Sequence, residues 1–306
     1  MLKEQILPLF GLKFRNAMEK QAFDFEKLQE IRIRAGHPMI MKENEREYLI
    51  KEYVTMKDVK DIVETACGYS GYAYEEEIKR GYLTIPGGHR IGLAGRAVTN
   101  IQGIQTLKHI SSLNIRIAHP VTGCAHKWMP YVYKGKKPCH ILIISPPGCG
   151  KTTLLRDMIR MFSEGSEQRP GLTVGVVDER SEIAGAYRGI YTYDLGMRTD
   201  VLDGCPKSLG MEMLLRSMAP RVLAVDEIGV SDVDSIENAL RCGCKVVATL
   251  HGECIEEFQR KPGFVSLVKE RIFERYILLK QGLVPGCVDR ILGQNFEILW
   301  EEEKCI

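Results

Sequence analysis

The 306-residue sequence contains no apolar run that approaches the ~18 residues of a transmembrane helix. Its amino-terminal segment is interrupted by charge every few positions and has no small-residue cleavage site. We therefore expect no signal peptide there and favour an amphipathic helix packed on its own domain. The sequence also lacks an excess of one charge, with 42 Lys and Arg against 40 Asp and Glu. This balance argues against a protein dedicated to nucleic-acid phosphates, without excluding a local basic patch.

The ten cysteines form no C-x-x-C pair and no zinc-ribbon spacing. A chain of this length needs no disulfide staples, so we interpret them as reduced thiols of a cytosolic protein. Cys242 and Cys244 are the closest pair, and their C-x-C spacing in a turn is only a weak indication of a metal site.

The length predicts two domains, and a hydrophobic fraction of 44% is typical of soluble globular proteins. We expect an N-terminal α/β domain over 1–125, a linker over 126–139 and a second domain over 140–306. The linker is indicated by Pro130 and Gly135, which are turn-forming residues beside a lysine cluster.

Apolar residues are spaced differently in the two halves of the sequence. The first half alternates apolar and polar residues in short runs, which is typical of half-buried antiparallel strands. Its expected elements are helices over 4–20 and 56–70 and strands over 30–36, 81–86, 89–98 and 110–118.

The second half predicts a doubly wound α/β fold. Nearly apolar runs, each followed by a helical pattern, indicate a parallel sheet covered by helices on both faces. These runs span 140–145, 172–179, 221–227 and 245–251, and two further segments beginning at 275 and 296 are expected to add edge strands.

The strongest motif is the sequence Ser-Pro-Pro-Gly-Cys-Gly-Lys-Thr over 145–152, between an apolar strand and an amphipathic helix. This context is the one in which a phosphate-binding loop cradles ATP, with backbone N–H groups and a helix N-terminus aimed at the phosphates. Lys151 is expected to reach the β- and γ-phosphates, and the Thr152 hydroxyl to ligate Mg²⁺. Ser145 replaces the first glycine of the usual pattern, which predicts an altered loop entry. The expected ATP-binding residues are Pro147, Gly148, Cys149, Gly150, Lys151, Thr152 and Thr153.

A second motif, which accompanies the phosphate-binding loop, is an apolar strand that ends in Asp226 and Glu227. Two adjacent buried carboxylates are costly without a cation, and Mg²⁺ supplies one. We expect Asp226 to hold Mg²⁺ with Thr152, and Glu227 to polarise the attacking water. An acid pair of this kind predicts the additional-strand class of P-loop ATPases.

Further polar residues are expected at the same edge of the sheet. Thr249 and His251 follow the strand after the acid pair and are candidate γ-phosphate sensors. Hydrolysis also needs positive charge on the γ-phosphate, which an arginine finger supplies. The finger candidates are Arg180, Arg188, Arg216 and Arg221 in the second half and Arg90, Arg96 and Arg116 in the first.

Several longer stretches carry a resemblance to a known family. GGHRIGLAGRAV, VVDERSEIAGAYRG and the stretch from LDGCPK to VDEIG, in this order, resemble the stage III sporulation protein AA family of endospore-forming Firmicutes. That family is similar to the ring-forming ATPases of type II and type IV secretion. The resemblance assigns Glu179 to an acidic box and Arg216 to a Leu-Arg helix, and both are expected to serve catalysis.

The resemblance implies a cytoplasmic mother-cell ATPase with a RecA-like domain. It implies a hexameric ring that powers a channel to the forespore, associated with the membrane through partner proteins, with no nucleic acid. A nucleic-acid-dependent ATPase is the alternative, because helicases share the fold. A non-enzymatic nucleotide-gated scaffold is the third reading, and the intact set Lys151, Thr152, Asp226 and Glu227 argues against it.

Overall fold

The computed structural model describes residues 2–44, 46–69, 74–101, 103–119, 121–186, 189–282 and 285–302. It divides into two compact units: unit 1 comprises 1–119 with 185–192, and unit 2 comprises 120–184 with 193–306. Among the described residues, no helix is both long enough and apolar enough to cross a membrane.

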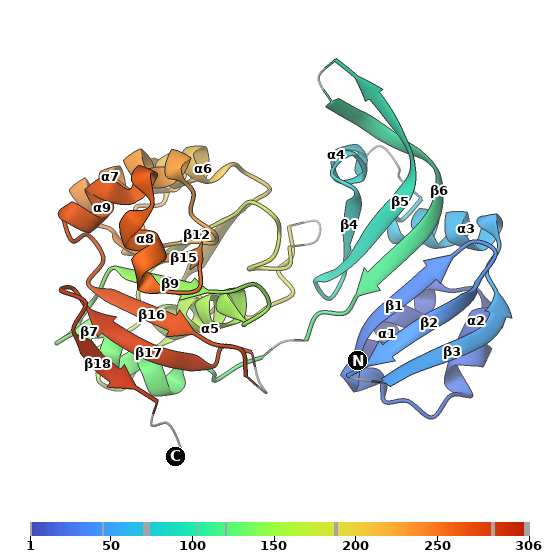
Figure 1. Cartoon of the computed structure of the whole chain (residues 1–306), viewed down its shortest axis with the longest axis horizontal. Helices are drawn as coiled ribbons and strands as arrows, with labels where there is room; N and C mark the ends of the chain where they lie inside the picture. Colours follow the sequence, from blue (N-terminus) through green and yellow to red (C-terminus); the bar gives the residue numbers. More distant parts are fainter. Residues whose placement is uncertain are drawn as a thin grey trace. The chain divides into compact units, whose positions relative to one another are not determined.

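Unit 1 is built on an antiparallel sheet with the order β3-β2-β1-β6-β5-β4 (Figure 1), which has six strands within the described residues. The strands are β1 (Leu28–Arg34), β2 (Pro38–Glu43), β3 (Arg46–Tyr53), β4 (Tyr82–Ile85), β5 (His89–Asn100) and β6 (Gly103–Arg116). The helices are α1 (Leu2–Ile6), η1 (Leu7–Leu9), α2 (Leu12–Glu19), η2 (Phe25–Lys27), α3 (Met56–Ala66) and α4 (Glu75–Lys79).

The two faces of this sheet differ because successive side chains of a strand point to opposite sides. On β1, Ile31 and Ile33 are fully buried, whereas Arg32 and Arg34 between and beyond them are exposed. The apolar face packs with the helices into one core. The other face carries the polar side chains.

The N-terminal helix is shorter than the pattern over 4–20 predicts. Pro8 lies inside the 3₁₀ turn η1, and Gly11 has an extended backbone as the N-cap of α2. Two short helices therefore replace one long helix, since proline cannot donate the next helical hydrogen bond.

Unit 2 contains a sheet with the order β13-β12-β14-β15-β9-β16-β17-β18, eight strands within the described residues. The first six run parallel, β17 pairs antiparallel with β16, and β18 pairs antiparallel with β17. The strands are β9 (Ile141–Ser145), β12 (Val174–Asp178), β13 (Thr199–Asp203), β14 (Val222–Val225), β15 (Lys245–His251), β16 (Arg275–Leu279), β17 (Val288–Gly293) and β18 (Ile298–Glu301).

Strand β15 lies between β9 and β14 in this sheet. The strand that precedes the glycine-rich loop is thus separated by one strand from the strand that ends in the acid pair. This arrangement confirms the predicted RecA-like fold of the additional-strand class.

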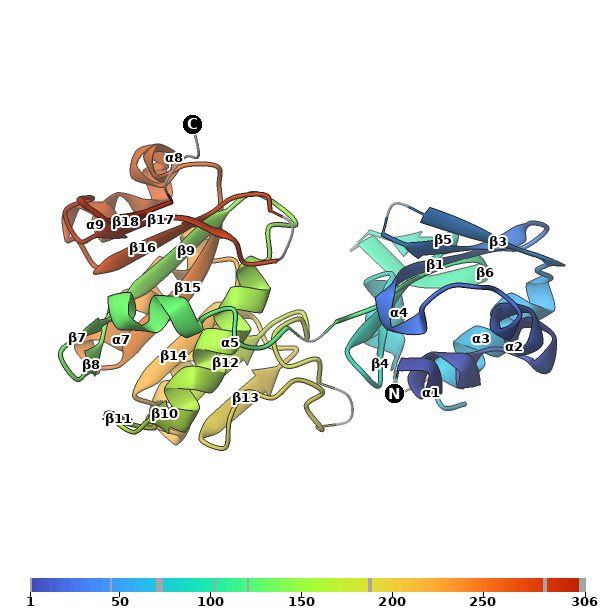
Figure 2. The same cartoon turned by 90° about the horizontal axis from the view of Figure 1, so that it is seen from below.

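Helices cover both faces of the unit 2 sheet. Alternate strand residues such as Leu142 and Ile144 share a core with four helices. Those helices are α6 (Lys207–Ser217), α7 (Val233–Arg241), α8 (Ile255–Arg260) and α9 (Val265–Lys269). Helix α5 (Lys151–Glu164) contacts β9, β12, β14 and β15 from the opposite face, and it crosses these strands in Figure 2.

Short elements complete unit 2. They are η4 (His126–Val132), β7 (Tyr133–Lys134), β8 (Lys137–Pro138), β10 (Gly165–Ser166), β11 (Arg169–Pro170), η5 (Val230–Asp232) and η6 (Pro262–Phe264).

The segment 126–139, expected to be a linker, is a folded part of unit 2. Val132 is fully buried, and the Trp128 ring packs edge-on against Trp300 of β18 with centroids 4.6 Å apart. The proline and glycine there form a 3₁₀ helix and a tight hairpin instead of a flexible connection. The strand beginning at Arg275 is also not at the edge, because β17 and β18 extend the sheet beyond it.

Candidate functional site

The glycine-rich loop joins the end of β9 to the start of α5. Gly148 and Gly150 have φ angles of 76° and 88°, in the left-handed region that favours glycine. A Cβ on Gly150 would lie 2.3 Å from the backbone nitrogen of Gly286. That nitrogen donates a hydrogen bond of 2.8 Å to the carbonyl of Cys149. The loop is therefore held close against a second segment, with the first N–H groups of α5 at its end.

The acid pair lies directly beside this loop. The Thr152 hydroxyl donates to Asp226 Oδ2 at 2.8 Å, and Lys151 Nζ pairs with Glu227 Oε1 at 2.8 Å. Lys151 is only 8% exposed. Two motifs that are 74 residues apart in the chain thus meet through two polar contacts.

Glu227 is held as a carboxylate in an unusual backbone conformation. Its φ of 46° lies in the left-handed region, which is uncommon for a residue with a Cβ. Burial alone raises the pKa of its carboxyl. The hydrogen bond and charge of Lys151, with the charges of Arg180 and His251, outweigh burial and lower this pKa below its usual value. Arg180 contributes a longer ion pair of 3.5 Å to the other carboxylate oxygen.

Thr249 of β15 links the two acids. Its hydroxyl accepts the backbone N–H of Glu227 at 2.8 Å and donates a hydrogen bond to Asp226 Oδ1. The side chain is fully buried. Thr249 therefore fixes the acid pair from inside the sheet.

Asp178, at the end of β12, organises the loop that follows it. Its carboxylate accepts the backbone N–H groups of Glu182, Ile183 and Ala184 at 2.8–3.0 Å. Burial nevertheless raises the pKa of Asp178 to about 6. Arg156 of α5 donates to the carbonyls of residues 182 and 183, so this loop is fastened to the helix of the phosphate loop.

A small cavity joins this loop to the acid pair. It is lined by Asp178, Glu179, Arg180, Glu182, Lys207, Asp226 and Glu227. Within it, Glu179 forms an ion pair with Lys207 of α6. The loop over 179–184 and the acid pair therefore line one cavity, and the acid pair in turn contacts Lys151 and Thr152.

His251 is exposed at the tip of β15, beside Ser145 of β9, and its charge acts on Glu227. Arg216 is exposed and pairs with Glu212 one turn earlier on α6. Arg221 precedes β14, at the end of the strand opposite the acid pair.

The other predicted arginines fall into two groups. Arg90, Arg96 and Arg116 belong to the sheet of unit 1. Arg188 lies outside the described residues.

Two residues of the site were not anticipated from the sequence. Lys207 forms an ion pair with Glu179. Arg156 stacks on the ring of Tyr193 at 3.7 Å and donates hydrogen bonds to the carbonyls of residues 182 and 183. Lys207 follows a proline before an ordinary helix, and no local pattern marks it. Arg156 lies five residues after Lys151 within an amphipathic helix, where a surface position is the usual reading.

The oxygen donors present suit a magnesium ion. A hydroxyl and a carboxylate are hard ligands, and Mg²⁺ is usually bound by one or two such groups with water and phosphate completing its shell. Thr152 and Asp226 already lie at 2.8 Å from each other, at the mouth of the phosphate loop. The predicted metal ligands are thus adjacent in space. A group of three or more His, Cys, Asp or Glu side chains able to bind a metal without nucleotide does not occur within the described ranges.

Comparison with known proteins gives consistent matches. The profile of the family described as "Sporulation stage III, protein AA" matches residues 1–299. Stage III sporulation protein AA of Bacillus subtilis (strain 168) is 42% identical over 273 residues, covering 89% of this chain and 89% of that protein.

Solved structures show the same fold at low sequence identity. The Legionella pneumophila ATPase DotB matches with a TM-score of 0.54 and 16% identity, covering 87% of this chain and 74% of that chain. The pilus retraction motor PilT with bound ADP matches with a TM-score of 0.58 and 14% identity, covering 98% and 84%.

Proposed function

Because the chain belongs to the family sporulation stage III, protein AA, we propose that it is a motor ATPase of the secretion type. It hydrolyses Mg-ATP and powers a channel between the mother cell and the forespore. The observation that carries this proposal is the meeting of Lys151 with Glu227 and of Thr152 with Asp226. A phosphate loop joined to an acid pair is the arrangement that positions ATP against an activated water.

The Lys151–Glu227 ion pair holds both side chains in place beside the phosphate loop. When triphosphate enters the loop, the Lys151 ammonium exchanges the carboxylate for phosphate oxygens. Glu227 is then released to accept a proton from water, and the loss of the Lys151 contact that lowers its pKa makes the carboxylate a stronger base. Mg²⁺, when bound at Thr152 and Asp226, supplies positive charge against the phosphate oxygens.

Arginine completes the charge balance of the reaction. Arg180 already lies 3.5 Å from Glu227 and is our first candidate for the transition-state charge within the same subunit. Arg216, Arg221 and the unit 1 residues Arg90, Arg96 and Arg116 are candidates for a neighbouring subunit. We propose a homo-oligomer, a hexameric ring, in the mother-cell cytoplasm, held at the membrane by proteins of the sporulation channel.

The test is ATP turnover and ATP binding by the purified full chain. Lys151→Ala should lose both, because the ammonium is the main contact to the phosphates. Glu227→Gln should retain binding and lose turnover, since the amide keeps the shape but cannot accept the proton. Glu301→Gln, on the edge strand β18, is the control and should resemble the original chain.

Two results would contradict the proposal. Normal turnover by Glu227→Gln would remove Glu227 from the role of base. Turnover that needs added single-stranded nucleic acid would favour the nucleic-acid-dependent alternative instead.

A further inference from the structure

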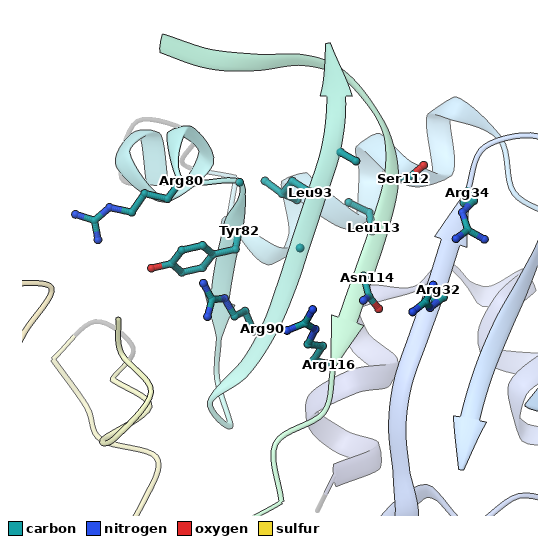
Figure 3. Close-up of a pocket in the computed structure, with 13 residues that line it drawn as sticks. Arg32, Arg34, Arg80, Tyr82, Arg90, Leu93, Ser112, Leu113, Asn114 and Arg116 are labelled. Atoms are coloured by element: carbon teal, nitrogen blue, oxygen red, sulfur yellow. The ribbon is translucent and has the colours of Figure 1, made fainter. Parts of the chain in front are cut away.

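Strands β5 and β6 continue beyond the sheet of unit 1 as a two-stranded ribbon. The pairing of β5 with β4 ends at Gly92, and the pairing of β6 with β1 ends at Ser112. Figure 3 shows Leu93 and Leu113, the cross-strand pair at this level, with both strands continuing past them. Among the described residues, the strand pairing over 94–110 therefore joins β5 and β6 alone.

Two β-bulges bend this ribbon. The register shifts once between Ala94 and Arg96 and once more farther along the ribbon. At the first bulge, a Cβ on Gly95 would lie 2.7 Å from the Cα of Ile110, so the two backbones are in close contact there. Bulges increase the bend and the twist of a strand pair, and Figure 1 shows the far ends of β5 and β6 leaving the other strands of the sheet.

The end of the ribbon is apolar and exposed. Asn100 and Gly103 are the last cross-strand pair, so the connection between the strands is only two residues long. Ile101 in this connection is 106% exposed, and Ile104 on β6 is 53% exposed. Connections of this length favour glycine, asparagine and aspartate, because these residues adopt the required backbone angles. A β-branched apolar residue there has no role in the turn and indicates a contact outside the chain.

The ribbon is also basic and contains no acidic residue. The sequence has no Asp or Glu from residue 78 to residue 156. Arg96 and Lys108 are exposed cross-strand partners, and like charges in this position destabilise a sheet. Within the described residues, neither of these two side chains forms an ion pair. An anionic partner would therefore remove a repulsion that is built into the ribbon.

Two acidic side chains of α4, the helix that packs against β6, are engaged elsewhere. Glu75 pairs with Lys79 at 3.8 Å, and the Glu77 carboxylate accepts the backbone N–H of Thr84 at 2.8 Å. These two carboxylates therefore do not pair with the cations of the ribbon.

An apolar end next to unpaired cations matches the surface of an anionic membrane. Such a surface accepts apolar side chains at the edge of its hydrocarbon layer and attracts Lys and Arg to its headgroups. The two cations lie four and five residues from the last cross-strand pair, from 96 to 100 and from 103 to 108, which is roughly 13–17 Å along a strand. A ribbon inclined to the membrane would place the isoleucines below the headgroups and both cations among them.

The composition of the ribbon favours lipid over nucleic acid. Proteins that bind single strands stack the bases on aromatic side chains. Residues 94–112 contain no Phe, Tyr or Trp, and the most exposed position is an isoleucine.

We propose that the β5–β6 ribbon is a direct membrane contact, which inserts Ile101 and Ile104 into a bilayer rich in anionic lipid. Arg96 and Lys108 bind the phosphate groups of the lipid headgroups. This contact is additional to attachment through partner proteins, and it does not depend on ATP hydrolysis.

The experiment is sedimentation of the purified full chain with lipid vesicles in the absence of nucleotide. One set of vesicles contains equal parts of phosphatidylcholine and phosphatidylglycerol, and the other contains phosphatidylcholine alone. We expect binding to the anionic set to be at least tenfold tighter and to weaken as salt is added. No sedimentation with the anionic vesicles, or equal binding to both sets, overturns the proposal.

Paired variants separate the apolar end from the charge. Ile101→Thr with Ile104→Thr keeps the β-branching and every charge, whereas Arg96→Gln with Lys108→Gln keeps the apolar end. Each pair should weaken binding to the anionic vesicles at least tenfold, and thermal unfolding confirms that unit 1 remains folded. Normal binding by the double threonine variant would show charge attraction alone and would overturn the insertion.

Two matched controls make the same changes elsewhere. Leu209→Gln with Met213→Gln removes exposed apolar residues from α6, and Arg46→Gln with Lys51→Gln removes two exposed charges from β3. Each control should change vesicle binding less than twofold. Controls that weaken binding as much as the ribbon variants would overturn the assignment to the ribbon.

Ile101→Trp measures insertion directly. Its added fluorescence, taken as the difference from the original chain, should shift to shorter wavelength on anionic vesicles and be quenched by brominated lipid. Tyr53→Trp, at an exposed position of β3, is the control and should not be quenched. The proposal is overturned if brominated lipid leaves the Ile101→Trp chain unquenched. It is also overturned if a single-stranded oligonucleotide, and no vesicle, binds through Arg96 and Lys108. Loss of ATP turnover would contradict the proposed function alone, since no nucleotide is present in these measurements.

Discussion

The hydroxyl of Thr249 accepts the backbone N–H of Glu227 at 2.8 Å, from the centre of the strand that separates the phosphate-loop strand from the acid strand. The same hydroxyl donates to Asp226. One side chain therefore sets the backbone of the proposed base and the orientation of the proposed metal ligand. The additional strand contributes directly to the site as well as to the sheet.

Thr249→Val should damage hydrolysis more than ATP binding. Valine keeps the shape and the β-branching of threonine but leaves the Glu227 N–H and one Asp226 oxygen without their partner, at a cost of about 1–3 kcal/mol. We expect kcat to fall roughly 10- to 100-fold, with the Kd for ATP changed less than fivefold. Thr249→Ser, which retains the hydroxyl, should recover most of kcat. Equal rates for the valine and serine variants would show that the hydroxyl does not position the acids.

Gly150→Ala should abolish ATP binding through the backbone. The added Cβ would meet the Gly286 nitrogen at 2.3 Å, and the φ of 88° is unfavourable for alanine. Because the obstacle is backbone, the loop must move away from residues 285–286. Gly123→Ala is the matched control in unit 2: its φ is 85°, but the new Cβ meets nothing within 4 Å. ATP binding by the control should stay normal, and normal binding by Gly150→Ala would contradict the close loop contact.

The sequence predicted the central strands of unit 2 well because burial leaves a local signal there. Strands β9, β12, β14 and β15 are each nearly apolar, so their positions can be identified from residues next to one another in the chain. Strand β13 was missed because its five residues are only partly buried and include two aspartates. Its pairing with β12 comes from the sheet and not from its own pattern.

Site residues also divide into those that a local motif identifies and those whose role depends on a distant partner. Lys151 and Glu227 belong to short motifs with a fixed chemical purpose, and each could be identified alone. Lys207 and Trp128 acquire their roles from partners far away in the chain, Glu179 and Trp300. Such pairings need the fold, which is why 126–139 was predicted to be a linker.

Arg180→Gln should lower kcat at least tenfold while leaving the stability of the chain unchanged. The side chain is 61% exposed, so its loss removes little folding energy, but its guanidinium is already 3.5 Å from Glu227. Arg241→Gln on α7 is the matched control, because Arg241 is also exposed and pairs with a glutamate at 3.5 Å. Steady-state turnover at saturating ATP measures the effect. A kcat within twofold of the original chain would show that another of the candidate arginines supplies the transition-state charge.

Glu274 offers a test of stability in unit 2 that is independent of nucleotide. Its carboxylate accepts hydrogen bonds from Lys134 at 2.9 Å, Lys245 at 2.8 Å and the backbone N–H of His140 at 3.0 Å. Burial acts to raise the pKa of Glu274, but the two lysines and the N–H lower it from 4.5 to about 2. A carboxyl with a depressed pKa stabilises the fold fully above pH 4.5, and this contribution is lost as the pH falls from 4.5 to 2.

Glu274→Gln should therefore lower the unfolding free energy of unit 2 by about 3 kcal/mol at pH 7, and by progressively less below pH 4.5. Both tryptophans of the chain, Trp128 and Trp300, lie in unit 2, so denaturation followed by their fluorescence reports this unit selectively. Glu237→Gln, which removes a pair at 3.5 Å on α7, should cost less than about 1 kcal/mol. If the two variants lose the same stability, or if the loss for Glu274→Gln does not shrink on acidification, the ionised carboxylate does not hold these strand ends together.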